Sequence, residues 1–353
     1  MTQSIRSFAT HAPTDRLGLF QFDRRTPRAD DVAIDILFCG VCHTDIHHSR
    51  NDWGRASYPM VPGHEIVGRV TEVGESVTRF KVGSLVGVGC MVDSCKSCVN
   101  CGKGWEQYCE SGSTFTYNSA DRQDASPTYG GYSEAIVVSQ DFVLSIPEGL
   151  DPAGAAPLLC AGITTFSPLR HWNVGPGSKV AVIGLGGLGH MALKLAKAMG
   201  AEVTLFTRSA GKEDDARRLG ADHVVHSTDV AQMEAALNQF ELIVDTVPYA
   251  HDLNVYMPTL VSGGTLVLVG YLGPVEPALL TGPMVLKRRA VAGSLIGGIA
   301  ETQEMLDFCG IHGITADIEI IPMQDVNEAY DRMLNSDVKY RFVIDMATLK
   351  EPA

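Results

Sequence analysis

Apolar and polar positions follow one pattern in the first part of the chain and another in the second. Residues 31–39 alternate at first and then become wholly apolar, and residues 66–73 and 84–88 are further runs rich in β-forming side chains. Glycine recurs between these runs, where turns are expected. Short strands separated by glycine turns predict a barrel-like β domain at the start of the chain.

From residue 179 the pattern changes to short, wholly apolar runs followed by segments of helical periodicity. Residues 180–183 form such a run, the glycine-rich segment 184–189 follows it, and apolar residues then recur at helical spacing over 188–199. A second β-type run covers residues 202–206. A G-x-G-x-x-G turn between a strand and a helix predicts a dinucleotide site, where the pyrophosphate meets the helix N-terminus.

The same alternation continues, and the end of the chain is expected to return to the first domain. We therefore predict an α/β fold in which residues 1–153 and 295–353 form a β-barrel domain and residues 154–294 form a Rossmann domain with a doubly wound parallel sheet. The strands predicted in this part lie at residues 242–244, 265–269, 290–294 and 340–345, and the helices at residues 252–260, 301–309 and 325–335.

Composition narrows the class of protein. A chain of 353 residues with 45% hydrophobic and 20% charged residues is typical of a soluble protein with two domains. The net charge of −13 argues against nucleic acid or an anionic membrane as a partner. No apolar run approaches the roughly 20 residues that span a bilayer, and the first residues lack a signal-peptide core. We expect a cytoplasmic protein with a small-molecule substrate.

Three residues of the β domain and its border form a candidate metal site. Cys42, His64 and Cys160 offer two thiolates and one imidazole, a set of donors that suits zinc. Three protein ligands leave a tetrahedral zinc ion one open position, which is typical of a catalytic site. The alternative is that these are ordinary buried residues, because free cysteine is among the most buried residue types.

Four other cysteines lie close together with the spacing C-x2-C-x2-C-x7-C. They are Cys95, Cys98, Cys101 and Cys109. Four thiolates close the tetrahedral shell of a structural zinc ion and leave no position for a substrate. An iron–sulfur cluster is one alternative, and four unrelated thiols are another. We expect this segment to lose its order without the metal.

Together these motifs resemble the zinc-dependent medium-chain alcohol dehydrogenases, and within them the cinnamyl alcohol dehydrogenase branch with its bacterial broad-specificity NADP-dependent aldehyde reductases. The resemblance implies a GroES-like catalytic domain, a Rossmann domain, two Zn²⁺ ions per chain and hydride transfer between NADPH and a carbonyl carbon. The branch is commonly dimeric, so a homodimer joined through its Rossmann sheets is expected. The resemblance rests on residues 40–45, 62–65, 95–109, 130–133, 159–164, 184–189 and 340–342.

The resemblance also implies roles for single residues. Thr44 would pass on the alcohol proton to His47, Asp45 would orient His64, and Glu65 would be an alternate ligand of the catalytic zinc. For His43 and His47 the alternative is an exposed histidine without a role. The cofactor would contact His43, Thr164, Gly184, Gly186, Gly187, Leu188, Gly189, Val247, Val269, Ser294 and Arg341. The substrate pocket would be lined by Trp53, Cys90, Phe115, Tyr117 and Ile296. For Phe115 and Tyr117 the alternative is that they anchor their loop by packing.

The end of the second Rossmann strand predicts the cofactor. NAD-dependent enzymes usually carry an acidic residue there for the adenosine ribose. This chain has Thr207 instead, followed by Arg208 and Ser209, with Lys212 one turn further on. Two cations and two hydroxyls suit a 2′-phosphate, so we predict NADP(H). The alternative is that Arg208 and Lys212 are solvated residues at a helix start.

The predicted function is reversible reduction of aldehydes to primary alcohols by hydride transfer from NADPH. Cinnamyl, benzyl, furfural-type and linear aldehydes all remain compatible with the sequence. One alternative is an NAD-dependent alcohol or polyol dehydrogenase. Others are a zinc-free quinone or enoyl reductase and a non-enzymatic nucleotide-binding protein of the same fold. Both cysteine-containing ligand sets and the Thr44–His47 relay are intact, which favours the zinc enzyme.

Overall fold

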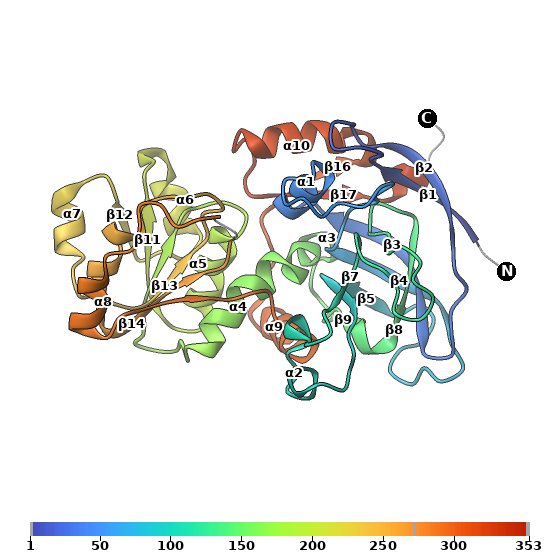
Figure 1. Cartoon of the computed structure of the whole chain (residues 1–353), viewed down its shortest axis with the longest axis horizontal. Helices are drawn as coiled ribbons and strands as arrows, with labels where there is room; N and C mark the ends of the chain where they lie inside the picture. The colour runs from blue at the N-terminus through green and yellow to red at the C-terminus, as the bar shows by residue number, and fades with distance from the viewer. Residues whose placement is uncertain (1–2, 271–272, 351–353) are drawn as a thin grey trace. The chain divides into compact units, whose positions relative to one another are not determined.

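Two compact units make up the protein in the computed structural model, which describes residues 3–270 and 273–350 (Figure 1). The first unit contains Met1–Cys160 and Gly297–Ala353, and the second contains Ala161–Ile296. The end of the chain therefore belongs to the first unit. The units follow the same order of segments as the predicted domains, whose limits at residues 153 and 295 stay a prediction.

A branched sheet forms the centre of the first unit. Its strands follow the order β16–β17–β3–β4–β5–β9, and β8 pairs with the first half of β3. All neighbours are antiparallel except β16 and β17. The strands are β3 (Asp31–Gly40), β4 (Ile66–Val73), β5 (Leu85–Val88), β8 (Ala135–Ser139), β9 (Leu144–Ser145), β16 (Ile318–Pro322) and β17 (Arg341–Asp345).

Two hairpin-like pairs and several short helices complete this unit. The pairs are β1 (Gln3–Ala9) with β2 (Gly18–Arg24), and β6 (Met91–Asp93) with β7 (Thr114–Phe115). The α-helices are α1 (His43–Ser49), α2 (Val99–Gly102), α3 (Pro152–Ala155), α9 (Ile299–His312), α10 (Val326–Leu334) and α11 (Ala347–Lys350). The 3₁₀ helices are η1 (Glu106–Tyr108), η2 (Gln140–Phe142), η3 (Ala156–Leu159) and η7 (Met323–Asp325). The helices predicted near residues 301 and 325 are thus present.

The second unit is built on a parallel sheet with the order β12–β11–β10–β13–β14–β15. The order reverses between β10 and β13, and ligands of doubly wound sheets bind at such a reversal. The strands are β10 (Lys179–Ile183), β11 (Glu202–Thr207), β12 (His223–His226), β13 (Phe240–Asp245), β14 (Leu260–Leu268) and β15 (Ala290–Gly293). The helices are α4 (Ala161–His171), α5 (Gly189–Ala198), η4 (Ala210–Lys212), α6 (Glu213–Arg218), α7 (Val230–Ala235) and α8 (Thr281–Lys287).

One predicted helix of this unit is wrong. Residues 252–260 form two 3₁₀ turns, η5 (Leu253–Val255) and η6 (Met257–Thr259), and β14 already begins at Leu260. Asp252 caps the first turn by accepting a hydrogen bond from Asn254 N, and Pro258 has no N–H to donate to an α-helical ladder. Among the helices that the structure describes, none has both the length and the apolar character of a membrane span.

Candidate active site

The first ligand of the candidate metal site is placed by the end of β3 and the start of α1. Gly40 ends β3, and Cys42 is the N-cap of α1, where its backbone N–H donates to Asp45 Oδ2 over 2.9 Å. A Cβ on Gly40 would lie 1.9 Å from Glu65 Oε2. Only glycine therefore lets the chain pass the Glu65 carboxylate on its way to Cys42.

Four buried side chains converge here. Cys42, His64, Glu65 and Cys160 place their ligand atoms within 4.8 Å of one another. The Sγ atoms of Cys42 and Cys160 lie 4.0 Å apart. Two sulfurs bound to one tetrahedral zinc ion at about 2.3 Å lie about 3.8 Å apart. The spacing and the donor chemistry of the residues present therefore fit zinc.

Asp45 holds the imidazole of His64. Its Oδ1 lies 3.1 Å from His64 Nδ1 and accepts the Gly63 N–H over 3.2 Å. A carboxylate can only accept here, so Nδ1 carries the hydrogen and Nε2 is available to a metal. Burial would lower the pKa of His64, but the Asp45 carboxylate outweighs it and the pKa is raised. The structure thus brings Asp45 to the predicted position.

Glu65 lies beside the metal ligands and is paired with Arg341. The Arg341 guanidinium donates to Glu65 Oε1, and both side chains are buried. Burial raises the pKa of Glu65 to about 7, although Arg341 opposes the rise. Glu65 Oε2 is buried without a hydrogen-bond partner, as suits a position facing a cation. The predicted contact of Arg341 with cofactor phosphates stays a prediction.

The two predicted relay residues lie on α1. Thr44 is partly buried, and His47 follows one turn later on the same side of the helix. His47 Nδ1 lies 2.7 Å from Asp52 Oδ2, and its side chain is 29% exposed. With Asp52 accepting from Nδ1, the Nε2 atom is left for proton exchange. Asp52 was not foreseen, although it lies only five positions from His47.

Aromatic side chains surround part of this site. The Tyr117 ring centroid lies 5.8 Å from that of His64 and 5.5 Å from that of His48, and Tyr117 is only 5% exposed. Trp53 packs against His47 and His48, at 5.2 and 4.8 Å between ring centroids. Tyr117 therefore lies beside the candidate metal ligand His64, and Trp53 lies beside the predicted relay residue His47, while their role as pocket walls stays a prediction.

The other predicted pocket residues are less closely grouped. Cys90 is partly buried, with its Sγ 3.9 Å from the carbonyl oxygen of Leu159, next to Cys160. Phe115 lies on β7 and is 42% exposed. Ile296 is buried, has a φ of +36° and belongs to the second unit. Their role in binding substrate stays a prediction.

The sequence did not predict that His48 and Asn118 lie next to Tyr117 at this site. Asn118 Nδ2 lies 3.1 Å from His48 Nδ1 and 3.2 Å from Arg55 O. Asn118 has a φ of +55°, a conformation that asparagine tolerates better than most residues. The signal available in the sequence was weak, since it consisted of a second histidine directly after His47 and an asparagine directly after Tyr117.

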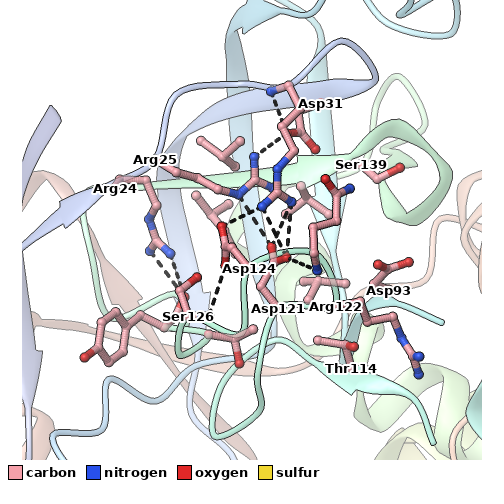
Figure 2. Close-up of a pocket in the computed structure, with 18 of the residues that line it drawn as sticks. Arg24, Arg25, Asp31, Asp93, Thr114, Asp121, Arg122, Asp124, Ser126 and Ser139 are labelled. Atoms are coloured by element: carbon pink, nitrogen blue, oxygen red, sulfur yellow. Dashed lines mark hydrogen bonds and ion pairs between the residues drawn. The ribbon is translucent and has the colours of Figure 1, made fainter. Parts of the chain in front are cut away.

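Charged side chains anchor the loop that carries Tyr117 and Asn118. Arg28 binds Asp121 over 3.0 Å and Asp124 over 2.7 Å, and Arg25 pairs with Asp31. Figure 2 shows Arg25, Asp121 and Asp124 turned toward one another among the residues that line a pocket. These ion pairs connect the loop to the segment between β2 and β3.

The second cysteine cluster fits a closed metal site. The sulfur atoms of Cys95, Cys98, Cys101 and Cys109 all lie within 4.8 Å of one another, with Cys101 3.9 Å from Cys95 and 3.5 Å from Cys98. Hydrogen bonds from the backbone N–H groups of Ser97 and Cys98 lower the pKa of Cys95 to about 5. Such bonds favour the thiolate form that binds zinc. These four residues therefore fit a structural zinc ion.

The glycine-rich turn has the geometry of a pyrophosphate site. Gly184 has a φ of +89°, and a Cβ on Gly189 would lie 2.1 Å from Gly184 O. A Cβ on Gly186 would meet nothing within 4 Å, so the backbone there is open to a ligand. Val247 lies against Gly184, 3.0 Å from the position of a Cβ. The turn between β10 and α5 consists of Gly184, Leu185, Gly186, Gly187 and Leu188.

No carboxylate ends β11. Its last residue is Thr207, which is buried, and Arg208 and Ser209 follow it exposed. The Lys212 Nζ atom donates to Leu185 O over 3.0 Å, which joins it to the glycine-rich turn. The structure therefore places Thr207, Arg208 and Ser209 at the end of the strand beside β10 and joins Lys212 to the glycine-rich turn.

The other predicted cofactor residues lie on several elements of the two units. Val269 and Ser294 directly follow β14 and β15, at the carboxyl edge of the sheet where dinucleotides bind. Thr164 is buried on α4. His43 is the first residue of α1, in the first unit. Their cofactor contacts stay predictions.

Known proteins match this chain over nearly its whole length. Residues 28–148 match the alcohol dehydrogenase GroES-like domain family, and residues 187–310 match the zinc-binding dehydrogenase family. NADP-dependent alcohol dehydrogenase C 1 of Mycolicibacterium smegmatis is 53% identical over 349 residues, 98% of this chain and 99% of the relative. Aldehyde reductase YahK of Escherichia coli is 51% identical over 348 residues, with coverage of 98% and 99%.

Solved structures agree with these relatives. The cinnamyl alcohol dehydrogenase SbCAD4 of Sorghum bicolor superposes with a TM-score of 0.94 at 46% identity, and 98% of each chain is covered. The cinnamyl alcohol dehydrogenase of Helicobacter pylori, solved in complex with NADP(H), gives a TM-score of 0.91 at 43% identity, with coverage of 98% and 99%. The chain belongs to the zinc-binding alcohol dehydrogenase family, with a GroES-like domain and a Rossmann domain.

Proposed function

We propose that this protein reduces aldehydes to primary alcohols, reversibly, with NADPH as hydride donor. The observation that carries the proposal is the convergence of Cys42, His64, Glu65 and Cys160 within 4.8 Å, all buried. With Cys42, His64 and Cys160 as its ligands, a zinc ion would have one position left for an alcohol or aldehyde oxygen. Zinc bound there supplies a Lewis acid.

The chain's own residues then handle the proton. Asp45 keeps the hydrogen of His64 on Nδ1, so that Nε2 would be free to bind zinc. The Thr44 hydroxyl passes a proton between the substrate oxygen and the imidazole of His47. The Nε2 atom of His47 exchanges it with solvent, while Asp52 holds Nδ1 over 2.7 Å.

NADP(H) is the proposed cofactor. Thr207 replaces the acidic residue that would bind a ribose diol, and Arg208, Ser209 and Lys212 supply donors for a 2′-phosphate. The Mycolicibacterium smegmatis relative is an NADP-dependent enzyme by name, and the Helicobacter pylori enzyme was solved in complex with NADP(H). An NAD-dependent alcohol or polyol dehydrogenase is disfavoured because it would need a carboxylate at position 207.

A homodimer is proposed for the assembly. β15 is the last strand of its sheet, and a strand edge can pair with a second copy. Next to it in sequence, Leu280, Val285 and Leu286 are 61%, 79% and 83% exposed. Apolar side chains so exposed are typical of a protein interface. The clustered metal-binding cysteines support a reducing compartment, the cytoplasm.

Initial rates with NADPH and NADH test the function on a panel of cinnamaldehyde, benzaldehyde, furfural and hexanal, together with elemental analysis for zinc. We expect two zinc ions per chain and turnover with NADPH. The ratio of the rates with aromatic and with linear aldehydes would then define the substrate class. A sample that holds both zinc ions and reduces none of these aldehydes would contradict the proposal.

A further inference from the structure

A tyrosine that the proposed function does not use binds the proposed phosphate-binding arginine. Arg208 Nη2 donates to the Tyr249 hydroxyl over 2.8 Å. Arg208 follows β11, and Tyr249 lies in the loop after β13. These strands flank β10 in the sheet, and β10 leads into the glycine-rich turn. The Arg208–Tyr249 bond therefore joins the two loops on either side of that turn.

The loop of Tyr249 is connected to the end of β13 through His251. The Tyr249 carbonyl oxygen lies 2.9 Å from His251 Nδ1, and His251 Nε2 lies 3.2 Å from Oδ2 of Asp245. Asp245 is fully buried at the end of β13, and its Oδ1 accepts the Val247 N–H over 3.1 Å. Contacts to the buried end of a central strand thus set the direction in which Tyr249 leaves the sheet.

Tyr249 restrains the Arg208 side chain but uses only part of its hydrogen-bond donors. The guanidinium carbon lies 5.9 Å from the Tyr249 ring centroid, within the range of a cation–π contact. Guanidinium has five N–H donors, so N–H groups remain for a phosphate. An arginine side chain loses much conformational entropy when it is fixed, and a partner that fixes it beforehand reduces that loss on binding. The Tyr249 hydroxyl accepts from Arg208, so its own hydrogen is also available.

We propose that Tyr249 is a positioning residue for the adenosine 2′-phosphate, and so a determinant of cofactor specificity. It holds the Arg208 guanidinium at the carboxyl edge of the sheet, with donors directed to a phosphate beside the glycine-rich turn. The inference rests on the proposed use of NADP(H). It adds Tyr249 of the loop after β13 to the 2′-phosphate site, which the sequence placed only after β11.

Calorimetric binding of 2′,5′-ADP and 5′-AMP to the zinc-loaded protein tests the inference, because these nucleotides differ only in the 2′-phosphate. The variants are Tyr249→Phe, Arg208→Ala and the double variant. Tyr108→Phe, an exposed tyrosine of the first unit, is the matched control. We expect Tyr249→Phe to weaken 2′,5′-ADP about three- to tenfold, the usual effect of one hydrogen bond, and to leave 5′-AMP unchanged.

The double variant separates positioning from a merely structural role. If Tyr249 acts through Arg208, Tyr249→Phe has little further effect once Arg208 is alanine. With NADPH, Tyr249→Phe should raise KM at unchanged kcat, and the melting temperature should match that of wild type.

Three results would overturn the inference. Equal weakening of both nucleotides, full additivity in the double variant, or unchanged 2′,5′-ADP affinity in Tyr249→Phe would each exclude a positioning role. Failure of the proposed cofactor looks different, because wild type would then bind 2′,5′-ADP no more tightly than 5′-AMP.

Discussion

Arg341 and Glu65, which are 276 positions apart in the chain, form a buried ion pair beside the candidate catalytic metal site. Arg341 is the first residue of β17, and Glu65 directly precedes β4. The C-terminal strand is therefore part of the environment of the metal ligands. A carboxylate left here without its cation would be buried and unpaired, which is costly.

Arg341→Ala should destabilise the protein by roughly 3–5 kcal/mol, because it removes one partner of a buried pair. Urea unfolding of the zinc-loaded protein measures this. The double variant Arg341→Met with Glu65→Leu should be more stable than Arg341→Ala, since it leaves no unpaired charge. Equal stability of Arg341→Ala and wild type would contradict the importance of the pair.

Cys160→Ser should remove the catalytic zinc ion and abolish turnover, because the site loses one of its two thiolates. Elemental analysis should find one zinc ion fewer per chain, while NADPH binding measured by fluorescence stays near the wild-type value. Cys309→Ser, a buried cysteine outside both clusters, is the control and should retain both ions. Wild-type rates in a Cys160→Ser sample shown to lack that ion would exclude the proposed mechanism.

Cys98→Ser should lower the melting temperature without acting on the chemistry directly. The four-cysteine cluster offers no position for a substrate, and the segment around it has little other apolar packing to hold its shape. Differential scanning calorimetry with zinc analysis tests this. An unchanged melting temperature in a variant that has lost one zinc ion would argue against a structural role.

His47→Ala should reduce the rate of aldehyde reduction by roughly 10²–10⁴-fold, as is usual for loss of a general acid–base group. Added imidazole should restore part of the rate. Asp52→Asn should have a smaller effect, because it removes only the partner of Nδ1, which lies 2.7 Å away. A His47→Ala enzyme as fast as wild type would show that solvent reaches Thr44 directly.

The charge cluster beneath the Tyr117 loop should make stability depend on pH in the acid range. Burial would raise the pKa of Asp121, but the hydrogen bonds and charge of Arg28 outweigh it, so the pKa is lowered. A carboxyl whose pKa is lower in the folded state contributes stability above its unfolded value, about 3.9, and loses it as pH falls through the folded value.

The difference in unfolding free energy between wild type and Asp121→Asn should therefore be constant above about pH 5 and shrink toward pH 3. Urea unfolding at several pH values measures it. Glu241→Gln, on an exposed position of β13, serves as the control for a surface carboxyl. A difference that does not change with pH would mean that Asp121 contributes no charge interaction with Arg28.

Much of the fold was predictable because local patterns and tertiary packing agree. The run at residues 180–183 and the following glycines correspond to β10 and its turn, since a buried parallel strand must be apolar and the turn must admit a close backbone contact. The helix predicted at residues 252–260 fails for a local reason, the proline at position 258. β12 was missed because it is a short edge strand that is only partly buried, so its sequence carries no apolar run.

The candidate ligands and the Asp45 partner of His64 were predictable, but the partner of Glu65 was not. Cys42, His64 and Cys160 belong to recognisable motifs, so their convergence could be expected. The pairing of Arg341 with Glu65 is set by the packing of β17 against β3, and no spacing rule expresses it. The same is true of Tyr249 and Arg208, since each residue alone reads as an exposed side chain of a loop.

The close approach of Gly40 to Glu65 has a consequence for protein engineering. Because a Cβ at position 40 would lie 1.9 Å from Glu65 Oε2, the two positions cannot be varied independently. A library that randomises only position 40 should return glycine almost alone. A library that also allows glycine at position 65 opens other residues at position 40, at the expense of the Arg341 pair, whereas alanine would keep a Cβ 2.9 Å from the new one. Position 65 must therefore change before position 40 can accept another residue.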